Sequence, residues 1–209
     1  MTTLSAQNTV YARCAGMAEI SALPLPQLVS RYRMGSETLD KRVFQLSAEQ
    51  VDQAFLPEAG VGRWPIRVLL GHLADAELAF VHRMRRVVGE DSPVFSVWDE
   101  NSFIDNGLYR HQRIPGHPSP LCGGHVAMLH TIRMWGAEWL DTLTDAQWER
   151  KGMHPDYGAI SVRDIAAMSV WHTEHHARFH NMKVERFLGP AVAMNVPKGK
   201  CGPSCGCHG

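Results

Sequence analysis

The stretch SVRDIAAMSVWHTEHH, residues 161–176, decides the fold that we predict for this chain. A small hydroxyl residue, Ser161, is followed three positions later by an acid, Asp164, which is typical of a helix N-terminus. Beyond it, side chains recur at the three- and four-residue intervals of an inward helix face. This face comprises Val162, Ile165, Ser169, His172, His176 and Phe179. The sequence therefore predicts a long amphipathic helix that ends at Gly189-Pro190.

Two histidines on this predicted face, His172 and His176, lie one turn apart. A four-residue spacing lets two imidazole nitrogens converge on a single ion. The alternative is that each is a hydrogen-bonded core histidine, but two neighbouring buried imidazoles need partners for four ring nitrogens. His175 lies about 100° from His176 around the helix, and His180 lies about 80° from His172. We expect them at the rim of a site or as hydrogen-bonding partners of its ligands.

A second long helix is predicted from Pro65 to about Gly89, and His72 falls on its apolar stripe. Other members of that stripe are Ile66, Leu69, Ala76, Ala79 and Arg83. Three imidazoles from two helices could complete a ligand set for one divalent metal ion and leave coordination positions open for water or substrate. We therefore predict that His72, His172 and His176 hold a metal ion.

Two further long helices are expected, from Pro26 to about Leu46 and from Val126 to about Leu143. Shorter capped helices begin at Ser47 and Thr144, where an amide side chain follows three residues later. The Pro- and Gly-containing stretch at residues 151–158 indicates a connector or a small hairpin. Four long helices joined by connectors of uneven length predict an all-α fold, a four-helix bundle.

The predicted bundle spans residues 26–189, preceded by an N-terminal extension over residues 1–25. A long loop, residues 89–124, separates its second and third long helices, and loops of this length are usually functional or disordered. Residues 190–209 are expected to form a flexible tail. Its thiols and imidazole are Cys201, Cys205, Cys207 and His208. They could bind zinc or copper(I), but their spacing matches no paired zinc-finger pattern. A flexible tail that binds metal only adventitiously or is redox-sensitive is preferred over a dedicated metal site.

Composition argues against several classes of protein. Lys plus Arg and Asp plus Glu both total 21, so the formal net charge is zero. Without a basic block the chain lacks the electrostatic footprint of a nucleic-acid-binding protein. No signal-peptide pattern or membrane-length apolar run occurs, so we expect a cytoplasmic protein without membrane contact. Five cysteines without paired spacing suggest reduced thiols and no disulfide framework.

Acidic residues near the predicted site are candidates for proton transfer. Asp75 lies about 60° from His72 around its helix, close enough to reach the ion or orient a ligand, whereas Glu77 lies about 140° away and is expected on a solvated face. Asp99 and Glu100 sit in the long loop, where one of them could accept a proton and either could simply cap a turn. Our candidates for the catalytic groups are therefore Asp75 and Glu100.

Three arginines, Arg83, Arg85 and Arg86, follow near the end of the same predicted helix. They could bind an anionic substrate or a thiol cofactor. Arginines near a helix C-terminus more often interact with solvent and the helix dipole, so both interpretations stay open.

Several motifs in this order resemble the DinB/YfiT-like superfamily. They are WPIRVLLGHLADAE (64–77), WDEN (98–101), HPDYG (154–158), VRDI (162–165) and WHTEHH (171–176). The resemblance spans roughly residues 26–189. It implies a four-helix bundle, often a homodimer, that binds a divalent metal ion such as zinc or nickel through three histidines. The matching motifs imply that His72, His172 and His176 are the three metal ligands in this chain.

The resemblance also implies two chemistries for a small-molecule substrate. One is metal-dependent hydrolysis, and the other is transfer or isomerisation with a low-molecular-weight thiol activated at the metal. The competing hypothesis is a non-catalytic metal-binding or stress-related protein. A cavity beside the metal would favour an enzyme, whereas a sealed site would favour the non-catalytic protein.

Overall fold

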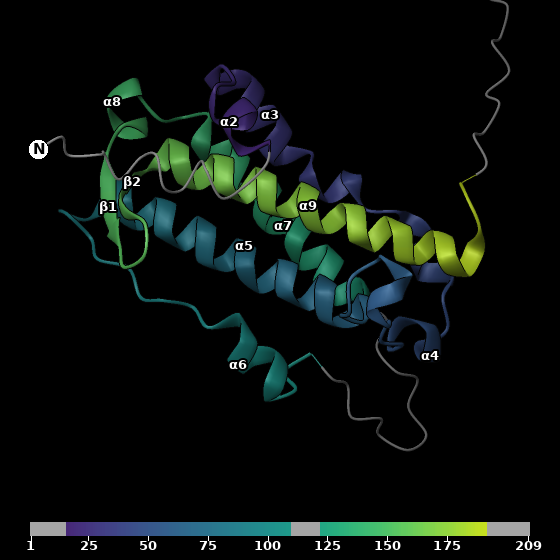
Figure 1. Ribbon diagram of the computed structural model, residues 1–209. Coiled ribbons are helices and arrows are strands. Elements are labelled where there is room, and N and C mark those ends of the chain that lie inside the picture. Colours follow the sequence, from purple (N-terminus) through teal and green to yellow (C-terminus); the bar gives the residue numbers. More distant parts are fainter. Residues whose placement is uncertain (1–15, 110–121, 192–209) are drawn as a thin grey trace, which may run out of the picture.

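The computed structural model describes residues 16–109 and 122–191. Its four main helices are α3 (Leu25–Arg33), α5 (Ile66–Gly89), α7 (Gly123–Leu140) and α9 (Val162–Leu188). Helices α5 and α3 each pack against both α7 and α9, so the four helices surround one interior (Figure 1). The predicted four-helix bundle is confirmed.

Short elements connect and extend these helices. They are α2 (Met17–Ser21), η1 (Gly35–Thr38), η2 (Lys41–Gln45), α4 (Ala48–Val51), η3 (Pro57–Ala59), α6 (Glu100–Asp105), α8 (Asp145–Trp148), β1 (Lys151–His154) and β2 (Gly158–Ser161). The capping boxes predicted at Ser47, Thr144 and Ser161 are all present, with both reciprocal hydrogen bonds formed. The helix starts were therefore readable from the sequence, because a capping box is a local pattern.

The first long helix is shorter than predicted. We expected it to reach Leu46, but α3 ends at Arg33 and two 3₁₀ turns follow. Arg133 of α7 explains the end, because its Nε donates to the carbonyl of Tyr32 at 2.6 Å and its guanidinium fills the space beside Gly35. The chain turns away there instead of continuing the helix. Phe44, which lies within the predicted helix, is 44% exposed as a result.

The stretch at residues 151–158 forms the small hairpin that was one of the two expected outcomes. Strands β1 and β2 pair in antiparallel register, with Lys151 opposite Ser161. The Cα of Gly152 lies so close to the ring of Phe95 that a Cβ there would be 2.5 Å from it. This contact fixes the chain that follows α5 against the hairpin, at the end of the bundle opposite α4 (Figure 1).

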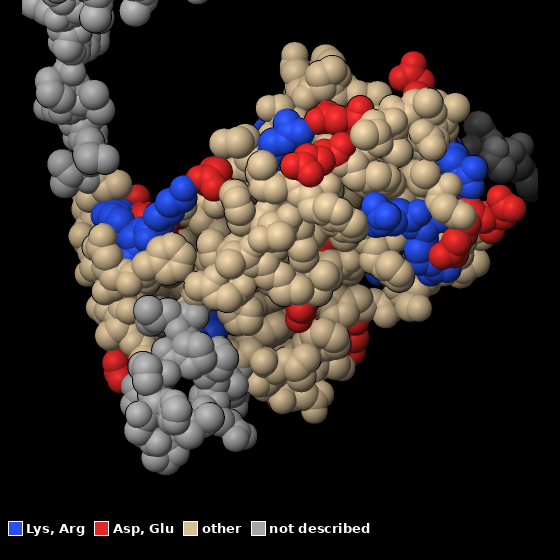
Figure 2. Space-filling view, turned by 180° about the vertical axis from the view of Figure 1, so that it is seen from behind, with Lys and Arg blue, Asp and Glu red and all other residues tan. Residues whose placement is uncertain are grey.

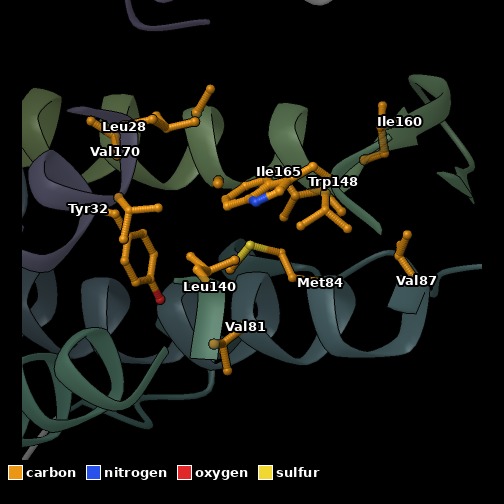
Figure 3. Packing of buried hydrophobic residues seen from close by; sticks show 14 of the residues in the cluster. Leu28, Tyr32, Val81, Met84, Val87, Leu140, Trp148, Ile160, Ile165 and Val170 are labelled. Carbon is orange, nitrogen blue, oxygen red and sulfur yellow. The ribbon is translucent and has the colours of Figure 1, made fainter. Parts of the chain in front are cut away.

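The core has two apolar clusters, one around Tyr32, Met84 and Trp148 (Figure 3) and a second that includes Leu69 and Leu129. Met17 and Ile20 of α2 are buried in the first of these clusters, although residues 1–25 were expected to form an extension. Helix α2 therefore packs as part of the bundle against α9.

The long loop between α5 and α7 contains the short helix α6 (Figure 1). The tail cysteines and His208 lie outside the described residues. Among the described helices, none is both long and apolar enough to span a membrane. On the face drawn in Figure 2, basic and acidic side chains are interspersed and uncharged residues cover most of the surface.

Candidate metal centre

Three histidines from two helices meet where α5 crosses α9. His72 comes from α5, and His172 and His176 come from α9. The Nε2 atoms of His72 and His172 are 3.0 Å apart, and one ring nitrogen from each of the three residues lies within 4.8 Å of the others. The sequence prediction that these three imidazoles share one point is thus confirmed by the geometry.

Burial keeps these imidazoles in the form that binds metals. His72 is 3% exposed, and desolvation lowers its pKa to about 4. Desolvation, assisted by the neighbouring His72, lowers the pKa of His176 to about 3. The pKa of His172 is lowered by burial and then by the two other rings. All three rings are therefore neutral near pH 7, with lone pairs available to a cation.

Aromatic rings enclose the three histidines. Trp98 stacks on His72 with ring centroids 5.3 Å apart, and Trp64 stacks on His176 at 5.8 Å. Phe80 meets His172 edge to face at 5.6 Å. Aromatic walls lower the local polarity and restrict side-chain rotation, so the imidazoles are held in place before any ligand arrives.

A cavity of about 540 Å³ adjoins the three histidines, which form part of its wall. Its other lining residues are Met17, Trp64, Phe80, Arg83, Val97, Trp98, Glu100, His154, Asp156, Tyr157, Met168, Trp171 and His175. A volume of this size is typical of small-molecule sites, which are mainly apolar with a few polar groups. The histidines therefore face space that a small molecule can occupy.

The donor set fits a divalent transition-metal ion. Three neutral imidazole nitrogens are the ligands of many catalytic zinc sites, and small rotations about the side-chain bonds bring nitrogens within 4.8 Å of one another onto one ion. The Nδ1 atom of His72 is buried and has no hydrogen-bond partner among the described residues. The Nε2 of the same ring faces the Nε2 of His172 at 3.0 Å, and one cation shared by the three rings would satisfy this close approach, which favours ligand binding over core packing.

The family model described as the DinB superfamily matches residues 31–179 of the chain. The chain belongs to the DinB superfamily. The matched region includes His72, His172 and His176 as well as the hairpin.

Curated relatives of this DinB superfamily chain are named for metal-dependent hydrolysis. A "putative metal-dependent hydrolase" of Oceanobacillus iheyensis is 25% identical over 158 residues, which are 76% of this chain and 84% of that protein. YfiT of Bacillus subtilis, named in the same way, is 28% identical over 129 residues, 61% of this chain and 67% of YfiT.

A solved structure supports the same fold. The structure of YfiT, described as a probable metal-dependent hydrolase with an unusual four-helix bundle topology, matches with a TM-score of 0.65. The match has 23% sequence identity and covers 80% of this DinB superfamily chain and 89% of YfiT. Likeness at this level of identity establishes the bundle architecture.

The acidic candidates have different surroundings. Glu100, at the start of α6, lines the cavity. Asp75 does not line it, and its carboxylate accepts a 2.8 Å hydrogen bond from the hydroxyl of Tyr109. Asp99 caps α6 by accepting hydrogen bonds from the backbone and side chain of Ser102, as one of the two interpretations for it expected. Only Glu100 of the two catalytic candidates faces the space next to the histidines.

The prediction that Glu77 lies on a solvated face was wrong. Glu77 is 1% exposed and pairs with Arg133 of α7 at 2.5 Å, and its other oxygen accepts from the hydroxyl of Tyr32 at 2.6 Å. The hydroxyl of Ser169 also donates to this carboxylate, at 2.8 Å. Sequence reasoning missed Arg133, although it occupies the buried stripe of α7 four residues after Leu129, which is a readable signal.

Of the other histidines and arginines considered above, some line the cavity and others do not. His175 lies at the edge of the cavity, as expected, whereas His180 is fully buried and bonds to Asn181, so the rim position predicted for it was wrong. Arg83 lines the cavity. Arg85 instead stacks over Trp135 and Trp139, and Arg86 pairs with Glu90.

Proposed function

We propose that this chain is a metal-dependent hydrolase that cleaves a small-molecule ester or amide. The observation that carries the proposal is the placement of three neutral imidazoles, one buried and two partly buried, in the wall of a cavity of about 540 Å³. The names of the relatives support the same class of reaction. A non-catalytic metal-binding protein would gain nothing from a cavity of this size beside its ligands, so the cavity favours the enzyme.

His72, His172 and His176 would hold the ion, and zinc or nickel suits a ligand set made only of imidazoles. Such an ion supplies Lewis-acid chemistry, which polarises a carbonyl oxygen and makes water more acidic. The aromatic walls exclude bulk water from the reacting bond and orient the apolar body of the substrate. The imidazoles keep their donor form because burial keeps them uncharged.

Glu100 is the group that we assign to proton transfer. Glu100 lines the cavity and is half-buried at the first turn of α6. A carboxylate in this position accepts the proton of the attacking water at one of its oxygens and can return it to the leaving group. Asp75 acts through Tyr109 as a positioning residue, because their hydrogen bond ties the end of the segment that carries α6 to α5.

The test uses the full chain freed of metal with a chelator and reloaded with Zn²⁺ or Ni²⁺. We expect one ion per chain and hydrolysis of 4-nitrophenyl esters or 4-nitroanilides that disappears when the metal is removed. Glu100→Gln should keep the ion and lower kcat by about 10²- to 10⁴-fold. Stoichiometric metal without turnover across a wide panel of esters and amides would contradict the proposal and favour a metal-binding protein. Turnover only in the presence of an added thiol would assign a thiol-dependent transferase instead.

A further inference from the structure

Arg83 lies on the same face of α5 as His72, at the other end of the cavity. Eleven residues separate the two, and at about 100° per residue this brings Arg83 to within about 20° of the direction of His72. At a rise of about 1.5 Å per residue the two Cα atoms lie about 16 Å apart along the helix axis. Both side chains line the same cavity. The cavity therefore has a metal-binding end and a guanidinium end.

The guanidinium of Arg83 has no carboxylate partner among the described residues. Its Nη2 donates to the carbonyl of Ser96 at 2.9 Å, and its Cζ lies 5.8 Å from the ring centroid of Phe95. Burial lowers the pKa of Arg83. Arg86, by contrast, forms an ion pair with Glu90. A partly buried arginine without a counter-charge, facing a cavity, is a site that an anion can complete.

The cavity wall also has apolar parts. Met17, Phe80, Met168 and Trp171 are among its lining residues. His154 and Tyr157 of the hairpin stand near the Arg83 end, where burial and then the charge of Arg83 lower the pKa of His154. His154 is therefore uncharged near neutral pH, and Arg83 supplies the positive charge at this end.

We propose that Arg83 binds a carboxylate at the end of the substrate remote from the bond that is cleaved. The inference rests on the proposed function and narrows its substrate class to esters or amides with an apolar body and a terminal carboxylate. A single guanidinium balances one negative charge. Asp156 and Glu100 also line the cavity and oppose a second one, so the geometry favours a carboxylate over a phosphate dianion.

The first test measures binding and needs no metal and no activity. Octanoate and its neutral analogue octanamide are titrated by calorimetry into the metal-free full chain. We expect octanoate to bind about 10- to 100-fold more tightly, the range typical of a charge-assisted hydrogen-bonded pair. Arg83→Gln should remove this preference, and Arg83→Lys should keep part of it. Arg85→Gln is the matched control, since Arg85 lies two residues further on α5 and stacks on Trp135 outside the cavity.

Equal binding of the two compounds, no binding of octanoate at millimolar concentration, or a preference that survives in Arg83→Gln would each overturn the assignment. Because Arg83 also anchors the carbonyl of Ser96, thermal unfolding of each variant is recorded by circular dichroism. The charge-retaining Arg83→Lys variant then separates loss of the charge from a change in the loop.

The second test uses the zinc-loaded enzyme and two esters of equal chain length, mono-4-nitrophenyl suberate and 4-nitrophenyl octanoate. We expect kcat/KM to favour the charged ester by about 10- to 100-fold, and Arg83→Gln to reduce its kcat/KM to that of the neutral ester. If neither ester is cleaved, the octanoate titration still decides the role of Arg83, and the wide panel of esters and amides decides the proposed hydrolase. Cleavage of both esters at equal rates would overturn the carboxylate site alone.

Discussion

The interior of the bundle holds two polar clusters that differ in whether their polar atoms have hydrogen-bond partners within the protein. In the first, Glu77 and Arg133 form a buried ion pair whose oxygens and nitrogens bond to neighbouring hydroxyls. In the second, the ring nitrogens of His72, His172 and His176 lie near one another beside a cavity. Both clusters involve α5 and α9. The first is surrounded by protein groups that bond to it, whereas the second borders a cavity.

This difference separates a structural cluster from a binding site. The carboxylate of Glu77 accepts from Tyr32, Ser169 and Arg133, so only the Nη2 of Arg133 lacks a partner among the described residues of that cluster. Buried polar groups that are paired fix one packing arrangement, whereas unpaired donors beside a cavity leave room for a ligand. The comparison predicts that mutations in the first cluster change stability and mutations in the second change metal content.

The largest effect is expected from removing a metal ligand. His176→Ala deletes one of three donors, so we expect the zinc content measured by elemental analysis to fall from about one ion per chain to nearly none. His175→Ala is the matched control, because His175 is the neighbouring, exposed residue at the edge of the cavity. It should retain the ion. Loss of zinc in both variants, or in neither, would remove the distinction between the two clusters.

The second effect concerns the buried ion pair. Arg133→Met leaves Glu77 charged and buried without its partner, which typically costs about 3–5 kcal/mol of the free energy of unfolding. The double variant Glu77→Leu with Arg133→Met replaces both charges by apolar groups and should recover most of that loss. Urea denaturation followed by circular dichroism measures both.

Zinc content sharpens this second prediction. The double variant should keep one ion per chain, since neither residue belongs to the three-histidine cluster. A double variant as unstable as Arg133→Met alone would contradict this prediction. It would show that the hydrogen bonds of the pair to its neighbours stabilise the fold, in addition to the neutralisation of one charge by the other.

The two clusters also differ in how far the sequence predicted them. The histidines could be found because their inward positions follow from the spacing within α5 and α9, and the capping box at Ser161 fixes where α9 begins. Helix periodicity and caps are local, so the four helices and the cluster of three histidines could be predicted.

The Glu77–Arg133 pair could not be found in this way. Helix α5 packs against α7 as well as α9, so it has two buried faces, and the direction about 140° from His72 points to protein and not to water. Which charges meet across the interior depends on tertiary packing. The same arginine ends α3 early by bonding to the carbonyl of Tyr32, and nothing within residues 26–46 carries that information.

A third buried polar group, Lys183 of α9, tests the comparison through pH. It is fully buried, its Nζ donates to the carbonyl of Val61, and it lies between the rings of Phe55 and Phe179. Burial lowers its pKa from 10.5 to about 8. Between about pH 8 and 10.5 the unfolded chain then binds more protons than the folded chain, so stability rises with pH in this window.

We expect the free energy of unfolding of the native chain to gain about 3 kcal/mol relative to Lys183→Met across that window. Urea titrations at several pH values measure the difference. If the difference in free energy of unfolding between the two proteins stays constant with pH, the pKa of Lys183 is the same in the folded and unfolded chain. The ammonium would then be stabilised in its buried site, as the guanidinium of Arg133 is.

The smallest effect is expected at the hydrogen bond between Tyr109 and Asp75. Asp75 is close in sequence to His72, but its carboxylate already has a protein partner, like that of Glu77. Asp75→Ala and Tyr109→Phe should each lower the free energy of unfolding by about 0.5–1.5 kcal/mol, and the double variant by little more than either, because both remove the same hydrogen bond. Zinc content should not change in any of the three, since Asp75 already has a partner. A marked loss of zinc affinity in Asp75→Ala alone would indicate that this carboxylate is a fourth metal ligand. Asp75 would then belong with the three histidines and not with the hydrogen-bonded groups of the core.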